Sequence, residues 1–197
     1  MAEIVDGTGL GFGVRVDEQN RLHAHAVTVT EVVQSSEKGF GYNINTGPIS
    51  ITASGTLLYF QNLDAQDFVI EAVALGNDGG ATYTTRPSVT FVRNPTGGDL
   101  ITDQTPVDMN QNRDFGSSNV LNAVSYKGKT GGTLTGGDDI ALLQASTAGR
   151  DFYTINFIIP EGKALGVIYD GSGISAGTSS IYAAIIGYLR DPAGEDN

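Results

Sequence analysis

Short runs of β-branched and aromatic residues recur along the whole chain, and glycine-rich turns such as "NTGP", "GNDGG", "RNPTGG" and "TGGDD" separate them. Glycine accounts for 27 of the 197 residues, about twice its usual share of roughly 7%, which is typical of many tight turns. This pattern predicts an all-β protein, an antiparallel β-sandwich or a barrel. The predicted strands are 41–45, 49–53, 56–61, 68–75, 88–92, 120–126, 152–159, 164–169 and 180–189.

Two further segments carry patterns that a helix could also satisfy. They are "AQDFVIEAVALG" at 65–76 and "DDIALLQAS" at 138–146. Both are short and both are bounded by turn sequences, which favours strands over helices.

The clearest alternation of the chain lies in "LHAHAVTVTEVV", residues 22–33. Its β-branched residues recur at every second position, and this predicts a strand. His23 and His25, the two histidines of the chain, would then point to the same face. One chain offers too few ligands for a metal site, whereas a three-fold axis would bring six imidazoles together, as in the His-x-His sites of some phage tail spikes. A metal site and two histidines that merely sit on a strand both remain open.

The two ends of the chain differ from its middle. Residues 1–20 hold glycine at alternate positions from Gly7 to Gly13, and 191–197 are polar and charged. We therefore divide the chain into an extended N-terminal arm, 1–20, a β-sandwich domain, 21–190, and a polar tail, 191–197. The arm is expected to lie against a neighbouring subunit through Phe12 and Val14. No segment has the length of a membrane span or the pattern of a signal peptide.

Charge and residue types restrict the function further. The net charge of −11 disfavours nucleic acid as a partner, and the absence of cysteine excludes disulfides and thiolate chemistry. "DMNQNRD" at 108–114 begins like a calcium loop but lacks the glycine and glutamate that the pattern requires, so a polar loop is expected there. Both histidines lie on one predicted strand, which disfavours a Ser-His-Asp arrangement. We expect no enzyme activity, no cofactor and no membrane contact.

Several segments of the sequence resemble a family of tailed-bacteriophage virion proteins that are often associated with the head. They are "YNINTGPISI", "LLYFQNLDAQDFVIEAVALG", "VRNPTGGDLIT", "QNRDFGSSNVLNAVSYKGKTGGTLTGGDD" and "FIIPEGKALGVIYD". The resemblance covers about 16–189, and 112–137 is its most characteristic part. It implies a β-sandwich of jelly-roll type, no catalytic residues, and an oligomer, most plausibly a trimer, fixed on a particle.

From this resemblance we expect a decoration or cement protein that is made in the host cytoplasm and binds the outside of the capsid. Its partners would be the major capsid protein and two further copies of itself, at three-fold positions of the shell. Arg93, Arg113 and Arg150 are candidate anchors because arginine is enriched in interface hot spots. The alternative is a tail-associated or receptor-binding jelly roll that recognises host surface glycan.

Overall fold

The computed structural model describes residues 15–16, 22–23 and 31–190 of the chain. The chain divides into two compact units, 1–30 and 31–197, which we describe separately. In the first unit, β1 (Arg15–Val16) pairs antiparallel with β2 (Leu22–His23), and Arg15 lies opposite His23. The rest of the predicted arm, including Phe12 and Val14, lies outside the described residues, and so do His25 and the tail 191–197.

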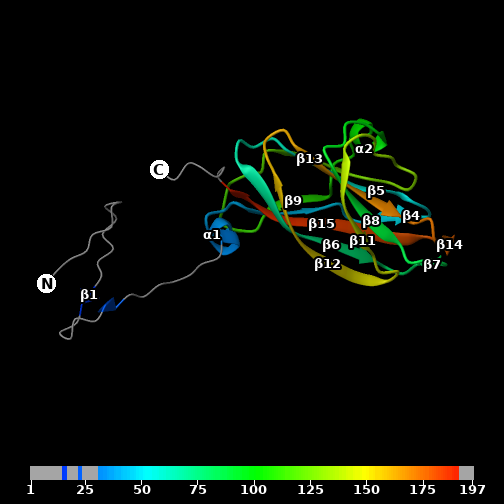
Figure 1. The fold of residues 1–197 in the computed structure, drawn as a ribbon, viewed down its shortest axis with the longest axis horizontal. Coiled ribbons are helices and arrows are strands. Elements are labelled where there is room, and N and C mark those ends of the chain that lie inside the picture. Colours follow the sequence, from blue (N-terminus) through cyan, green and yellow to red (C-terminus); the bar gives the residue numbers. More distant parts are fainter. Residues whose placement is uncertain (1–14, 17–21, 24–30, 191–197) are drawn as a thin grey trace. The chain divides into compact units, whose positions relative to one another are not determined.

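The described part of the second unit, 31–190, consists of two large antiparallel sheets, a two-stranded ribbon and two short helices (Figure 1). The strands of the first sheet, here the β6 sheet, are in order β12 (Gly149–Ile159), β6 (Asp67–Asn77), β15 (Ser179–Arg190), β3 (Gly41–Asn45) and β9 (Met109–Asn112), with β4 (Ile49–Ile51) also paired to β15. Those of the second, the β5 sheet, are β10 (Ala123–Lys127), β5 (Gly55–Asn62), β13 (Ala164–Asp170), β8 (Ser88–Arg93) and β11 (Asp138–Gln144). A small ribbon pairs β7 (Ala81–Tyr83) with β14 (Ile174–Gly177).

The strand pairing is that of a jelly roll. Going inward from both ends of the chain, β3 pairs with β15, β5 with β13, β6 with β12 and β8 with β11. The chain is therefore wound as one long antiparallel hairpin whose successive pairs alternate between the two sheets. The predicted all-β, jelly-roll-like antiparallel sandwich is confirmed.

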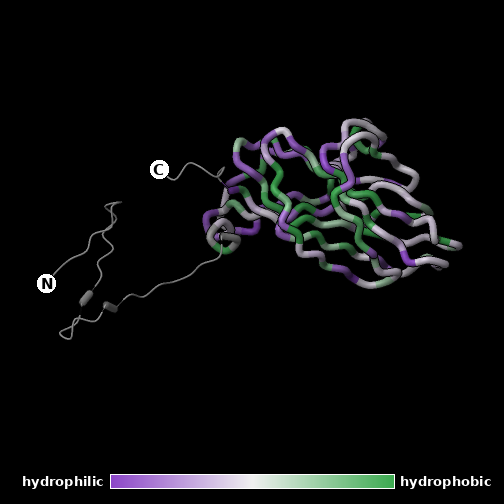
Figure 2. The backbone as a smooth tube through the Cα atoms, viewed as in Figure 1, coloured by the Kyte–Doolittle hydropathy of each residue, from purple (hydrophilic) through white to green (hydrophobic). Residues whose placement is uncertain are grey.

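The core lies between the two sheets, and the strands of both sheets contain hydrophobic stretches (Figure 2). Phe60 packs on Phe68 with ring centroids 4.7 Å apart, and Phe91 meets Phe157 edge to face at 5.8 Å. Each fully buried side chain of this size contributes about 1.5–3 kcal/mol through removal of apolar surface from water. Because Phe157 of β12 packs on Phe91 of β8, the core also holds the edges of the two sheets side by side.

The outer face of the β5 sheet is covered by the chain itself. The connection from β8 to β11 contains α2 (Asp99–Thr102) and β10, and it forms a second apolar cluster in which Tyr59, Leu100 and Ala164 are buried. A Cβ on Gly166 would lie 2.4 Å from Leu134 Cδ1, so this close approach depends on glycine.

The other predicted strands are confirmed with small differences at their ends. Each predicted range beyond residue 40 contains a strand, and the two helix-compatible segments are β6 and β11. The prediction missed β7, β14 and β9. Since β9 covers Met109–Asn112, the polar loop predicted for 108–114 is wrong in its middle.

The strand predicted for 22–33 is wrong at its C-terminal end, because Glu31–Glu37 form the helix α1. Gly39 ends this helix with φ of 75°, its N–H donating to Ser36 O at 3.0 Å, while the Phe40 N–H donates to Ser35 O at 2.7 Å. These two bonds are the Schellman arrangement that satisfies the last carbonyls of a helix. The capped end and the contacts of α1 with β3 and β15 outweigh the strand preference of the valines. Residues 24–30 lie outside the described residues.

Candidate protein-binding surface

The outer face of the β6 sheet carries apolar side chains on β12, β6, β15 and β9, whereas β3 contributes Asn43 and Asn45. Residues directly opposite each other share a face, and one such row runs Phe152, Ala74, Ala184, Asn45, Met109. The next row runs Thr154, Ala72, Ile186, Asn43, Gln111. In a β-sandwich, the residues on the outward face of a sheet are normally polar. We call this surface the outer apolar face; its members are Ala72, Ala74, Met109, Phe152, Ile158, Tyr182, Ala184 and Ile186.

Several members of the outer apolar face are accessible to a partner. Phe152 is 63% exposed, Ile158 49% and Met109 44%, and the side chains of Tyr182 and Ile186 are half-buried. The ring of Tyr182 lies over Gly76, where an added Cβ would be 1.9 Å from its Cζ atom. A side chain at this position would displace the ring.

One end of this face is closed by the chain itself. Arg113, one of the predicted anchors, lies over Gly41 and donates to Gly187 O at 3.4 Å, and its Nη1 atom is 3.8 Å from Glu71 Oε2. Its side chain is only 21% exposed. The structure therefore places Arg113 within the fold, bridging strands, while the rest of the face stays open.

The open edge of the sandwich carries a second exposed group of residues. β12 and β11 are the last strands of their sheets on the same side, since Phe157 packs on Phe91 of β8, the strand paired to β11, and the Tyr153 hydroxyl donates to Gln144 O at 2.6 Å. We define the edge patch as Arg150, Phe152 and Ile158 of β12, which share the outer face of the β6 sheet; Asp139 and Leu142 of β11 point away from the core on the opposite side of the sandwich. Leu142 is 68% exposed.

Both edge strands are irregular in the middle. The register of β12 with β6 shifts between Thr154 and Phe157, and that of β11 with β8 shifts between Asp139 and Ala141. Bulges of this kind interrupt the row of free backbone groups and discourage the addition of a further strand. A partner at this edge therefore meets mainly side chains.

A cleft of about 520 Å³ opens at one end of the same edge. Its lining is mostly apolar, with Ile140, Phe157 and Leu165, and Arg93 lies at its rim. This predicted anchor is paired with Asp138 at 2.6 Å, and both side chains are more than half exposed. Such an exposed ion pair contributes about 0–1 kcal/mol.

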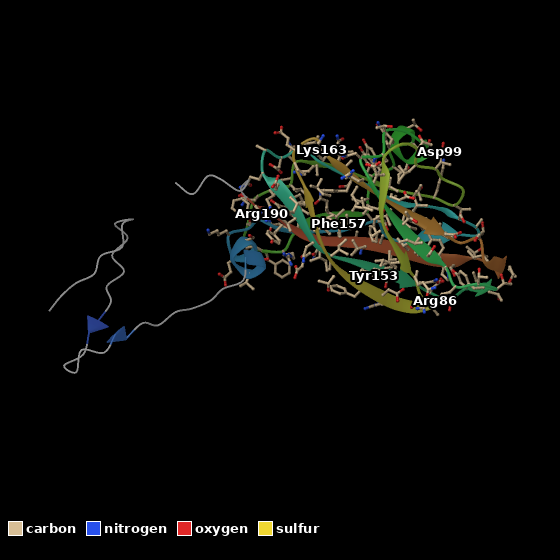
Figure 3. All side chains as sticks on the ribbon, viewed as in Figure 1. Arg86, Asp99, Tyr153, Phe157, Lys163 and Arg190 are labelled. Atoms are coloured by element: carbon tan, nitrogen blue, oxygen red, sulfur yellow. The ribbon has the colours of Figure 1, made fainter. Side chains whose placement is uncertain are left out.

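The opposite end of the sandwich holds a hollow of about 360 Å³ with a different character. It is lined by hydroxyl-bearing residues of two loops, Thr84, Thr85, Ser146 and Thr147, together with Arg86. Figure 3 shows Arg86 far from Lys163, which lines the cleft. Arg86 is partly committed, because its Nε donates to Ala145 O at 3.2 Å.

Two tyrosines near this hollow, Tyr153 and Tyr169, have raised pKa values. Burial, and next the charge of Asp151, raise the pKa of Tyr153 to about 12. Burial and the hydrogen bond to Tyr83 raise the pKa of Tyr169 further. Both hydroxyls thus stay protonated and act as structural hydrogen-bonding groups.

The described residues contain no group of three or more His, Cys, Asp or Glu side chains that could hold a metal ion. The alternating polar residues of 108–114 bind separate partners and do not converge on one point. Asp108 binds Lys127 at 2.5 Å, Asn112 donates to Gly39 O at 2.6 Å, and the Asp114 carboxylate accepts the Gly116 N–H at 2.9 Å. Nor is any helix in the described part of the chain long and apolar enough to cross a membrane.

The predicted anchors therefore do not form one site. Arg93 lies at the cleft, Arg113 is covered, and Arg150 is exposed on the edge patch. Sequence reasoning missed the outer apolar face, although a signal was present. The runs "FVIEAVAL" of β6 and "IYAAIIGY" of β15 are apolar at consecutive positions, which indicates strands covered on both faces.

Comparisons with known proteins do not assign the chain to a family. No protein-family model matches the sequence, and no curated protein matches it. The fold is similar to a chain in the crystal structure of tomato aspermy virus, with 11% sequence identity over 89% of this chain and 86% of that chain. The TM-score is 0.25, and a similarity this low does not bear on function.

Proposed function

We propose that this protein is a structural component of a tailed-phage virion that binds the outside of the capsid and stabilises the shell. The observation that carries the proposal is the outer apolar face, an accessible and nearly uncharged sheet surface on a chain with a net charge of −11. Large exposed apolar patches on a soluble fold mark surfaces that bind other proteins. The sequence segments that resemble phage head proteins, and the jelly-roll winding, agree with this role.

In this proposal the partner of the outer apolar face is the major capsid protein. Burial of apolar surface stabilises a contact by roughly 25 cal/mol per Å², less the cost of association, and each bound copy ties neighbouring shell subunits together. The chain makes and breaks no covalent bond and needs no cofactor. The acidic surface keeps the protein away from the genome.

We further propose a homotrimer seated at three-fold positions of the shell, because a symmetric oligomer matches the symmetry of its seat. The protein would be made in the host cytoplasm and added to the particle. Phe115, which is fully exposed in the segment 112–137, would be a second contact with the shell.

The decisive experiment measures copies per particle by quantitative mass spectrometry, with and without Met109→Asp. Met109 is 44% exposed on the outer apolar face, so we expect high copy number for the unchanged protein and reduced occupancy for the variant. Leu63→Asp is the matched control, because Leu63 is 38% exposed away from this face. A handful of copies, or equal occupancy for both variants, would contradict a cement role.

One observation favours a second function, a tail-associated or receptor-binding protein that recognises host glycan. The hydroxyl-lined hollow with Arg86 offers several hydrogen bonds to a sugar. Low copy number together with glycan binding that Thr85→Val weakens would support this alternative over the first.

A further inference from the structure

We infer that the cleft at the edge of the sandwich binds a small apolar carboxylate, an acyl or aryl chain that ends in one carboxyl group. The inference concerns a ligand of the single chain, so it goes beyond the proposed function and does not depend on it. The apolar body of the ligand would lie between the two sheets, and its carboxylate would lie at the rim of the cleft.

The cleft lies where the interior of the sandwich opens between its two sheets. Leu165 of β13 pairs with Arg93 of β8, and Arg93 pairs with Asp138 of β11, so these three residues share one face of the β5 sheet. Phe91 belongs to the core and precedes Arg93 by two residues, which makes this the inner face. Phe157 lines the cleft from the other sheet and packs on Phe91. The cleft is thus an unfilled continuation of the core.

The size and the lining of the cleft fit a small apolar ligand. Its volume of about 520 Å³ lies within the range of roughly 300–1,000 Å³ that is usual for ligand sites. At about 30 Å³ for each non-hydrogen atom, the volume of a water molecule, there is room for on the order of 15 such atoms. Ile140, Phe157, Ile159 and Leu165 supply apolar surface on several sides. A ligand that covers this surface gains the free energy of removing it from water.

The two bulges of the edge strands lie at this cleft. Ile140 is the unpaired residue of the bulge in β11, and Asn156 lies within the register shift of β12. Both residues line the cleft. Bulges re-aim side chains and are frequent beside binding sites, and they also interrupt the row of free backbone groups that an extended peptide would need. The edge therefore favours a compact ligand over a peptide strand.

The charged residues of the lining select an anion. They are Arg93, Lys163 and Asp138, two cations and one anion, in a chain whose acidic residues outnumber the basic ones by 22 to 11. Asp138 is paired with Arg93, whereas Lys163 is exposed and forms no ion pair with another described residue. The labels of Lys163 and Phe157 in Figure 3 mark the charged and the apolar part of the site. One surplus cation matches one carboxylate.

The first test uses the purified full chain with phenylbutyrate as the probe and phenylbutanol as the uncharged molecule of similar shape. NMR titration of isotope-labelled protein should show saturable shifts for residues of the cleft, with a Kd for the acid on the order of 1 mM, as expected for a ligand of this size. The alcohol should bind about three- to fivefold more weakly, because it lacks the charge that Lys163 attracts. Acetate, which has the charge without the apolar body, should not saturate these shifts.

The second test separates the charged and the apolar part of the site. Lys163→Met should lower the affinity for the acid about three- to fivefold and leave that for the alcohol unchanged. Lys38→Met is the matched control, because Lys38 is exposed and does not line the cleft. Ile140→Ser should weaken acid and alcohol alike, whereas Leu142→Ser, at an outward residue of the same strand, should change neither.

Three results overturn the inference. They are shifts that do not saturate, shifts that map to residues outside the cleft, and an affinity for the acid that Lys163→Met and Lys38→Met change equally. None of these results affects the proposed binding to the capsid, because that proposal is tested by copies per particle and this one on the isolated chain.

Discussion

The hydroxyl oxygens of Tyr83 and Tyr169 lie 3.0 Å apart and join the small β7–β14 ribbon to the β5 sheet. The Tyr83 hydroxyl also accepts from Asn77 Nδ2 at 3.0 Å and lies 3.2 Å from Ser179 Oγ. Tyr169 is 1% exposed and Ser179 is fully buried. One hydroxyl thus satisfies polar groups from three strands at the end of the sandwich that holds the hydroxyl-lined hollow.

Tyr83→Phe should therefore destabilise the fold by about 1–3 kcal/mol, because it leaves the buried Tyr169 hydroxyl without this partner. Urea unfolding followed by circular dichroism measures the change in the free energy of unfolding. Tyr182→Phe is the control, since that ring lies on the outer apolar face, and we expect a change within about 0.5 kcal/mol. Equal losses for both variants would show that the network adds nothing.

Tyr153 and Tyr169 should limit stability at high pH. In the folded state the pKa of Tyr153 is raised to about 12 and that of Tyr169 is raised further, from the ordinary value of 10.0. The folded state therefore holds protons that the unfolded state releases, and stability falls as pH rises above about 10. Urea midpoints should be level between about pH 7 and 9 and then decrease. A midpoint that stays level up to about pH 12 would refute this assignment.

Gly39 ends α1 with a left-handed backbone, φ 75°, and a Cβ there would lie 2.2 Å from Ser117 Oγ. Gly39→Ala should cost roughly 1 kcal/mol for the backbone and more for the displaced serine. Gly131→Ala separates the two terms, because Gly131 has φ of 67° with nothing within 4 Å. Thermal unfolding should show the larger loss for Gly39→Ala, and the reverse order would mean that the helix end matters little.

The sequence predicts the strands of this fold well and the contacts between them poorly. Alternation and glycine-rich turns are local signals, so β6 and β11 are recognisable even though their residues are compatible with a helix. The strand predicted for 31–33 is wrong for a local reason. The hydrogen bonds that end the helix at Gly39 favour helix here, whereas the valines alone favour a strand. A polar run followed by glycine was the available signal.

The candidate surfaces depend on distant parts of the chain. Phe152 and Ala184 share a face only because β6, which is distant from both in the sequence, pairs with β12 on one side and with β15 on the other, and spacing along the sequence does not reveal this. Arg150 is recognisable as a candidate anchor from residue type alone, but its place beside Phe152 on the edge strand of the β6 sheet requires the strand order. Arg113 shows the opposite case, in which a promising residue type is covered by the fold.

Asn62 offers a final test of how the edge is held. It is fully buried at the end of β5, and its Nδ2 donates to Ile159 O at 2.9 Å and to Gln66 O at 2.8 Å, while its Oδ1 accepts the Asp64 N–H at 3.0 Å. Ile159 is the last residue of β12, so this side chain fixes the strand that carries the edge patch.

Asn62→Asp keeps the shape and replaces the donor by an acceptor that faces two carbonyl oxygens. We expect a loss of roughly 3 kcal/mol or more at neutral pH, because a buried charge is left unpaired. The unfavourable surroundings should raise the pKa of the new carboxyl, so the variant should regain stability as pH falls and the group is protonated. Asn122→Asp, at an exposed asparagine, is the matched control and should show neither effect. Chemical unfolding of both variants at neutral and mildly acidic pH measures these changes. If the stability of Asn62→Asp does not depend on pH, the carboxylate has turned out to solvent, and the bond to Ile159 does not hold β12 in place.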